Sequence, residues 1–238
     1  MESWEHQISA VAALDEPTRR RLYEYVVRQP KPVSRDEAAA ALELPRTTAA
    51  FHLDQLVDQN LLEVSYQRRT GRTGPGAGRP AKLYQRSRHQ VALSLPQRHY
   101  ELAGLLLAGA LEHAEHSRGS PRVILNQRAY QLGKRLGEAA RDTASNGESD
   151  DIALRVLGDY GFEPRVERDG IVLGNCPFHA LAQQYTELVC GMNLSLLEGL
   201  LDGLATTRFT GRLHPSPPHC CVRLIPGGKD QAGVPASG

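Results

Sequence analysis

This chain of 238 residues has no long hydrophobic run. No stretch approaches the roughly 18 uninterrupted apolar residues that a membrane-spanning helix needs. Its N-terminus also lacks the basic segment followed by an apolar segment that marks a secretory signal. The sequence shows no arrangement of carboxylates or oxyanion donors that is typical of an enzyme active site. We therefore expect a cytoplasmic protein that is neither an enzyme nor a membrane protein.

Acidic residues are absent between Val64 and Tyr100. Eight basic residues lie in the same segment: Arg68, Arg69, Arg72, Arg79, Lys82, Arg86, Arg88 and Arg98. Because the whole chain carries a formal charge of +1, its remaining residues carry −7. A basic segment on an acidic body indicates contact with a polyanion at one place on the molecule.

Cysteine is scarce, and all of it lies in the last third of the chain, at Cys176, Cys190, Cys220 and Cys221. In a reducing compartment, grouped cysteines more often indicate metal or redox chemistry than disulfides. Buried cysteines also occur as ordinary small hydrophobic residues. Neither the two close Cys-x2-Cys pairs of a zinc ribbon nor the cysteine run of a ferredoxin is present, so both of these sites are excluded.

Helical patterns account for much of the first ninety residues. Apolar residues recur at helical spacing over 16–27, where a proline stands at the first turn. Ser34 and Glu37 form a capping box that opens a helix over 35–42. A third helix is predicted through 46–60. The three helices would pack together through their apolar faces.

A hairpin is predicted after the third helix. Residues 61–66 and 82–85 have the composition of strands, and the glycine-rich segment 70–80 has that of a hairpin tip. Three helices followed by a two-stranded hairpin form a winged helix-turn-helix, whose second motif helix lies in the major groove of DNA. We therefore predict a winged helix-turn-helix DNA-binding domain over residues 1–90.

Six residues are predicted to contact DNA. They are Arg46, Thr47, Thr48 and His52 in the third helix, and Arg72 and Arg79 in the wing. Helix residues of this kind meet base edges or phosphates, and wing arginines follow the backbone or enter the minor groove. Arg and Thr in a first helical turn also occur as solvated residues, and His52 has the alternative of a buried helix histidine. The combination with the acid-free segment favours DNA binding.

A long helix is predicted over 96–118. One stripe of it is apolar or small: Leu102, Leu105, Leu106, Gly109 and Ala110. Most such stripes are core, but a helix directly after a DNA-binding wing often pairs with its twofold mate. We therefore expect a dimerisation helix, and a homodimer that binds a palindromic site on double-stranded DNA.

The expected fold class is α+β, with an α/β sensing domain over residues 121–226. Its predicted helices cover 126–143, 151–160, 177–188 and 194–205, with Cys190 and Gly191 ending the third of them. Its predicted strands are short and antiparallel and cover 163–167, 171–173 and 219–225. Residues 227–238 have the composition of a flexible tail.

Three cysteines are predicted to form one site. Cys176 lies at a strand–helix junction, where backbone N–H groups and the helix dipole lower a thiol pKa. Cys190 lies at a helix end and Cys220 on a strand, while Cys221 would point to the other face of that strand. Three thiolates suit an iron–sulfur cluster or zinc, and His179 is a candidate fourth ligand.

Three N-terminal segments resemble the winged-helix regulators of the ArsR-like superfamily. They are ALDEPTRRRLYEYV, AAFHLDQLVDQNLLEV and GRPAKLY. The wing motif Gly78-Arg79-Pro80, leading to Tyr84, is especially similar to a branch with a long C-terminal sensing domain. The resemblance implies a transcription factor that binds operator DNA as a dimer.

The C-terminal segments NCPFHALAQQYTELVCGMNLSLLEGLLDGL and CCVRL resemble the Suf-operon repressor (SufR-type) family. Its members are homodimers that bind a [4Fe–4S] cluster through three cysteines and repress iron–sulfur assembly genes. The resemblance implies cluster ligands at Cys176, Cys190 and Cys220, with Cys221 as an extra thiol. It also implies a repressor that senses iron–sulfur or redox status.

One alternative keeps the same scaffold and changes the stimulus. In it, the C-terminal domain holds zinc or a small apolar effector instead of a cluster. The apolar pocket would be lined by Leu181, Leu188, Leu196 and Leu200.

Overall fold

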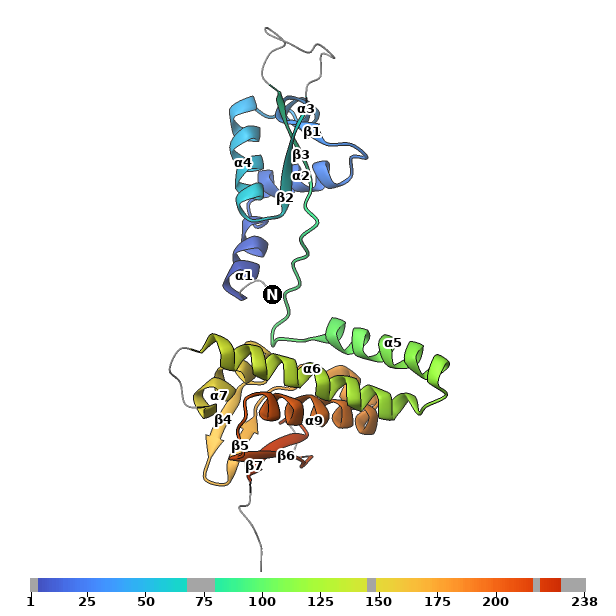
Figure 1. Cartoon of the computed structure of the whole chain (residues 1–238). Helices are drawn as coiled ribbons and strands as arrows, with labels where there is room; N and C mark the ends of the chain where they lie inside the picture. Colours follow the sequence, from blue (N-terminus) through green and yellow to red (C-terminus); the bar gives the residue numbers. More distant parts are fainter. Residues whose placement is uncertain (1–3, 68–79, 145–148, 216–218, 228–238) are drawn as a thin grey trace, which may run out of the picture. The chain divides into compact units, whose positions relative to one another are not determined.

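The computed structural model describes residues 4–67, 80–144, 149–215 and 219–227. The chain divides into two units, Met1–Leu93 and Ser94–Gly238, and each has its own core of buried residues (Figure 1). Helices and antiparallel strands occur in both units. Within the described residues, no helix has both the length and the apolar character that a bilayer crossing requires.

The first unit consists of four helices and a small sheet in the part that the structure describes. The helices are α1 (Trp4–Ala13), α2 (Pro17–Val27), α3 (Arg35–Ala41) and α4 (Arg46–Asp58). The strands are β1 (Val33–Ser34), β2 (Leu62–Gln67) and β3 (Ala81–Arg86), which pair antiparallel in the order β1-β3-β2. The predicted winged arrangement of three helices and a hairpin is present, with α1 and β1 added to it.

The helix starts follow the local sequence. The side chain of Glu16 accepts hydrogen bonds from the backbone N–H groups of Thr18 and Arg19, at 3.0 and 2.6 Å, and so caps α2. In the capping box of α3, the Glu37 N–H donates to Ser34 Oγ at 3.3 Å and the Ser34 N–H donates to Glu37 Oε2 at 2.7 Å. The capping box predicted from the sequence is therefore confirmed.

The second unit contains five helices and a four-stranded sheet among its described residues. The helices are α5 (Tyr100–Ser117), α6 (Pro121–Thr143), α7 (Ser149–Asp159), α8 (His179–Gln184) and α9 (Thr186–Gly203). The strands are β4 (Pro164–Glu167), β5 (Gly170–Leu173), β6 (Phe209–Leu213) and β7 (Val222–Pro226), in the order β4-β5-β7-β6. All pairings are antiparallel, and Ile171 of β5 faces Leu224 of β7. Of the predicted tail 227–238, only Gly227 lies within the described residues.

The C-terminal helices differ from the prediction at one important point. Cys190 and Gly191 were expected to end a helix, but both lie inside α9, which is continuous. The break comes earlier, at Tyr185, between α8 and α9. The apolar face of α9 continues across Cys190 because Val189, Met192 and Leu196 are all buried there, so the packing keeps the helix intact.

Glycines let α6 and α9 pack with their backbones in contact. A methyl group on Gly133 of α6 would overlap the carbonyl of Leu196, and one on Gly199 of α9 would overlap the carbonyl of Tyr130. On its other side α9 packs against the sheet, where Gly211 of β6 lies against Leu194. Figure 1 shows α9 between α6 and strands β5 to β7. The position of α9 is therefore tightly defined on both sides.

Replacing Gly199 with Ala should lower the free energy of unfolding of the second unit by about 2–3 kcal/mol, because two rigid backbones must separate. The matched control is Gly158→Ala, since a methyl group at Gly158 meets nothing within 4 Å. This control should be neutral or raise the free energy by up to about 1 kcal/mol, because Ala favours the helix. Urea titrations followed by circular dichroism would compare the two, and equal effects would contradict the close packing.

Candidate DNA-binding helix and cysteine site

The start of α4 projects from the first unit. The chain turns between α3 and α4 at Glu43, which has a left-handed backbone (φ 54°), and the Leu44 N–H donates to the Ala39 carbonyl at 2.9 Å. Ala49, Leu53 and Leu56 of α4 are buried. The first turn lies on the other side, where Arg46 and Thr47 are exposed and Thr48 is half-buried. This arrangement presents a polar helix end to solvent, as a major-groove helix requires.

Arg46 is held by the preceding helix. Its Nε lies 2.6 Å from Asp36 Oδ1 and its Nη2 donates to Asp36 Oδ2 at 2.9 Å, so the pair is bidentate. Both side chains are more than half exposed. An exposed ion pair contributes little to stability, so a DNA phosphate or base edge can replace Asp36 at small cost.

His52 and Phe51 lie on different sides of α4. The His52 side chain is only 13% exposed, and its Nδ1 lies 3.6 Å from Glu16 Oε2 at the start of α2. That environment resembles the alternative of a buried helix histidine. Phe51 is 60% exposed and lies one turn after Thr47, on the same face. The sequence analysis did not predict a DNA contact for Phe51. The available signal was an aromatic residue one helical turn after Thr47.

A polar contact ties the wing to α4. Asp54 Oδ1 accepts hydrogen bonds from Lys82 Nζ at 2.5 Å and from the hydroxyl of Tyr84, a buried residue of β3, at 2.8 Å. These bonds fix β3 against the helix, and the sequence alone did not indicate them. The predicted wing residues Arg72 and Arg79 lie outside the described residues.

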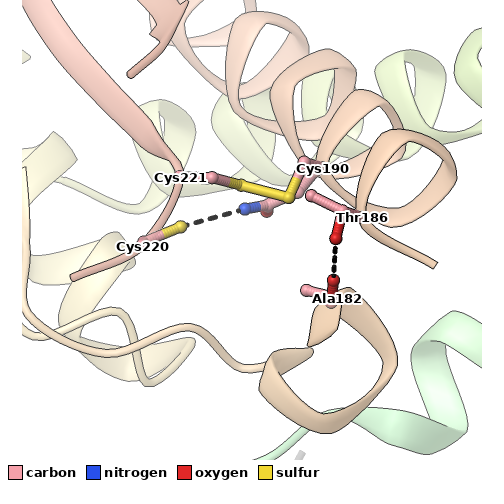
Figure 2. The surroundings of a disulfide bond; sticks show 6 residues. Ala182, Thr186, Cys190, Cys220 and Cys221 are labelled. Atoms are coloured by element: carbon pink, nitrogen blue, oxygen red, sulfur yellow. Dashed lines mark hydrogen bonds between the residues drawn. A yellow bond between two sulfur atoms is a disulfide. The ribbon is translucent and has the colours of Figure 1, made fainter. Parts of the chain in front are cut away.

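The cysteines occur as two pairs at one end of α9. Cys190 of α9 forms a disulfide with Cys221, with a Cα–Cα distance of 6.4 Å (Figure 2). Cys176 and Cys220 are free and buried. Cys221 was expected to point away from the others, but Cys220 and Cys221 precede β7 instead of lying within it. The alternation of a regular strand therefore does not separate their side chains.

The two free thiols influence each other's ionisation. Cys220 donates to Cys176, and this bond is the main reason that the pKa of Cys176 falls to about 7. Burial opposes the shift, while the Phe178 N–H and the charge of Arg98 support it. The pKa of Cys220 is raised by the same bond and by burial, because Cys220 keeps the shared proton. Cys176 is therefore the more acidic thiol of the pair.

Asn193 connects the two cysteine pairs. It lies one turn after Cys190 on α9, and its Nδ2 donates to Cys220 Sγ at 3.3 Å (Figure 2). Its side chain is buried, and among the described residues its Oδ1 has no hydrogen-bond partner. An orphaned buried amide oxygen is costly and calls for an explanation, such as a ligand in the site.

The predicted ligands are thus partly assembled. The structure brings Cys176 and Cys220 together and places Cys190 beside Cys221, whereas His179 is exposed at the start of α8. In the described residues, no group of three or more metal-binding side chains is arranged for an ion. The chemistry of the donors nevertheless fits a thiolate-bound cluster or zinc, with an amide donor to sulfur nearby.

The loop that carries Cys176 holds the segment before α5. Arg98 donates to Asn175 Oδ1 and, at 3.1 Å, to the Cys176 carbonyl. Asn175 is buried and donates to the Gln97 carbonyl at 3.1 Å. The His99 N–H donates to the Pro177 carbonyl at 3.0 Å. Sequence reasoning missed Asn175 and Arg98, because nothing local shows that residues almost eighty positions apart meet.

Two of the four leucines predicted to line an apolar effector pocket share a cavity among the described residues. Leu196 and Leu200 line a cavity of about 10 Å³, and Leu181 and Leu188 do not line it. A cavity of this size holds about one water molecule at most. The leucines of this cavity belong to the core between α6, α7 and α9.

The chain was compared with known proteins. Residues 14–65 match the model of a family described as a helix-turn-helix domain. These residues include α2, α3, α4 and most of β2. Neither the curated proteins nor the solved structures give a significant match. The match and the geometry of α4 support a DNA-binding transcription regulator with a winged helix-turn-helix.

Proposed function

We propose that this protein is a homodimeric transcriptional repressor of the SufR type, which senses iron–sulfur status through its C-terminal unit. In this proposal Cys176, Cys190 and Cys220 hold a [4Fe–4S] cluster, and α4 reads operator DNA. One observation carries the proposal: four cysteines from three separate segments of the chain gather in pairs around one end of α9, where Asn193 connects them.

Two properties of the site support a cluster. A bound cluster would supply a group that oxidants and iron limitation destroy. Cys176 contributes a thiolate that already has a lowered pKa, and the Asn193 amide supplies a donor to sulfur. The free thiols are buried, which limits access of water and oxidants.

A second candidate is a thiol–disulfide regulator without a cluster. The disulfide between Cys190 and Cys221 favours it, because those sulfurs already form the oxidised state of such a switch. In this candidate, reduction of the disulfide is the signal. The iron content of the protein separates the two candidates.

The cysteine loop has a route to the DNA-binding unit. Residues 97–99 lie between the end of the first unit at residue 93 and the start of α5, and the loop holds them through Arg98, Asn175 and Pro177. A change at Cys176 therefore alters the bonds that position this connecting segment. In the proposal, this change alters how two α4 helices of a dimer meet the two half-sites of an operator.

The exposed face of α5 supports a homodimer. The predicted stripe divides between two faces, because Leu106 and Ala110 are buried within the unit while Leu105 is 65% exposed. Leu111 is also exposed, at 56%. Together with the small residue Ala108 between them, these two leucines form an apolar face that a second copy of the chain would cover.

Anaerobically isolated protein should be coloured and contain iron and sulfide in the proportion of a [4Fe–4S] cluster. Cys176→Ala should lose most of this iron, because it removes the pre-formed thiolate. Absorbance spectra with iron, sulfide and zinc analysis would measure the outcome. Zinc in place of iron would support the zinc alternative, and colourless wild-type protein without either metal would leave the thiol–disulfide candidate.

Arg98→Ala should weaken the coupling between the cluster and DNA, while cluster loading should fall much less than in Cys176→Ala. It removes the donors to Asn175 and the Cys176 carbonyl but no proposed ligand. We expect the ratio of operator affinities between cluster-loaded and cluster-free protein to fall by about threefold or more, within the usual range of allosteric coupling. Arg141→Ala, which removes the same charge elsewhere in the second unit, is the control. An unchanged ratio in the Arg98 variant would contradict this route.

DNA contacts should separate into two classes. Arg79→Ala should weaken binding to all sequences and flatten the plot of log affinity against log salt by about one unit, as loss of a phosphate contact does. Arg46→Ala or Thr47→Ala should change the preference at one base pair by about 1–3 kcal/mol. Fluorescence anisotropy with operator variants at several salt concentrations would test both. Unchanged operator affinity in all three variants would show that α4 and the wing dock differently.

A further inference from the structure

Cys221 lies at the cysteine site although neither its position in the chain nor the three-cysteine pattern assigns it a role. We propose that Cys221 is the fourth ligand of the cluster, so that Cys176, Cys190, Cys220 and Cys221 form an all-cysteine site. This inference rests on the proposed function and adds the identity of the fourth ligand to it.

The disulfide shows where the Cys221 sulfur can reach. Its sulfur is one bond from that of Cys190, so the two side chains meet at the same point beside α9 (Figure 2). Any group held by Cys190 at this face of α9 is therefore within reach of Cys221 after small rotations of the side chain. Cys190 and Cys221 cannot be separated into ligand and bystander on the basis of position.

Cys220 faces the same helix as Cys221. Its sulfur accepts the hydrogen bond from Asn193, which lies one turn from Cys190 on α9. Adjacent residues of a regular strand would point to opposite faces. Here β7 begins only at Val222, so the backbone at Cys220 and Cys221 turns both side chains toward α9. Cys176 lies nearby, because the Cys220 N–H donates at 2.9 Å to the carbonyl of Leu173, three residues before Cys176.

Other candidate ligands are less well placed. His179 is exposed. His214 and His219 line a hollow of about 160 Å³ beside Cys220, together with charged Glu167 and Arg223. A histidine from this hollow would approach only from the Cys220 side, whereas Cys221 is already joined to the proposed ligand Cys190.

Loading of the site requires the disulfide to be opened. A dithiol reductant transfers two electrons and two protons to the Cys190–Cys221 bond, becomes a cyclic disulfide itself, and leaves two free thiols. After the loss of a cluster, hydrogen peroxide would take two electrons and two protons from the same two thiols and become two molecules of water, while the two sulfurs couple again. The cluster-free site then contains the disulfide, and a thiol must reduce this disulfide before a new cluster can bind.

The test compares clusters in the wild-type protein and in Cys221→Ala, both reconstituted anaerobically with a dithiol. Four cysteine ligands make the iron atoms of the wild type similar in Mössbauer spectra. In Cys221→Ala one iron should become distinct, and mild oxidation should convert the cluster to a [3Fe–4S] form visible by electron paramagnetic resonance. Adding a small thiol such as mercaptoethanol should restore the wild-type spectrum, because it supplies the missing thiolate.

His219→Ala and His179→Ala are the matched controls, and both should keep the wild-type spectrum. A distinct iron in the wild type that Cys221→Ala leaves unchanged would overturn the inference, as would a distinct iron that appears only in a histidine variant. Wild-type protein that binds no iron at all would instead refute the proposed function, so the two failures are distinguishable.

A second measurement needs no variant and stays informative if Cys221→Ala fails to fold. Iodoacetamide is added anaerobically to the reduced, cluster-loaded wild type, and the cysteine peptides are analysed by mass spectrometry. Cys221 should be protected from iodoacetamide to the same extent as Cys190. After a chelator has removed the iron, both cysteines should become labelled. Labelling of Cys221 in the loaded protein, with Cys190 protected, would overturn the inference.

Discussion

The backbone contact between α6 and α9 is the constraint on which the second unit depends. Gly133 and Gly199 allow the two helices to approach until side chains no longer separate them, and the sheet holds α9 from the other side. Helix α9 therefore cannot rotate or shift without disturbing both layers. Its rigid position determines where Cys190 and Asn193 point, so the geometry of the cysteine site is a consequence of core packing.

The loop that carries Cys176 belongs to the cysteine site and also holds the segment before α5. Cys176 contributes its sulfur to the site and its carbonyl to Arg98, while the adjacent Asn175 holds Gln97. The Cys176 sulfur and the segment that leads into α5 are therefore linked by the hydrogen bonds of a few neighbouring residues. Few residues lie between the sulfur of Cys176 and this segment, since the loop and the segment are in direct contact.

Local patterns predicted much of the secondary structure correctly. The capping box at Ser34, the start of α2 and the hairpin strands all depend on neighbouring residues, and the structure confirms them. The wrong predictions concern features that depend on distant partners. Cys190 was expected to end a helix, because a cysteine followed by glycine is a weak local signal, but the buried face of α9 continues through it. The short strand β1 exists only because β3 pairs with it.

The sequence by itself determined the starts of α2 and α3, the winged arrangement that the helix-turn-helix match supports, and the location of all four cysteines in the last third of the chain. Only the tertiary structure decided which sulfurs meet: Cys221 with Cys190, and Cys220 with Cys176. The physical reason is the distance along the chain between the residues that interact. Caps and turns involve residues a few positions apart, whereas the meeting of a loop, a helix and a strand start is set by how the layers around α9 pack.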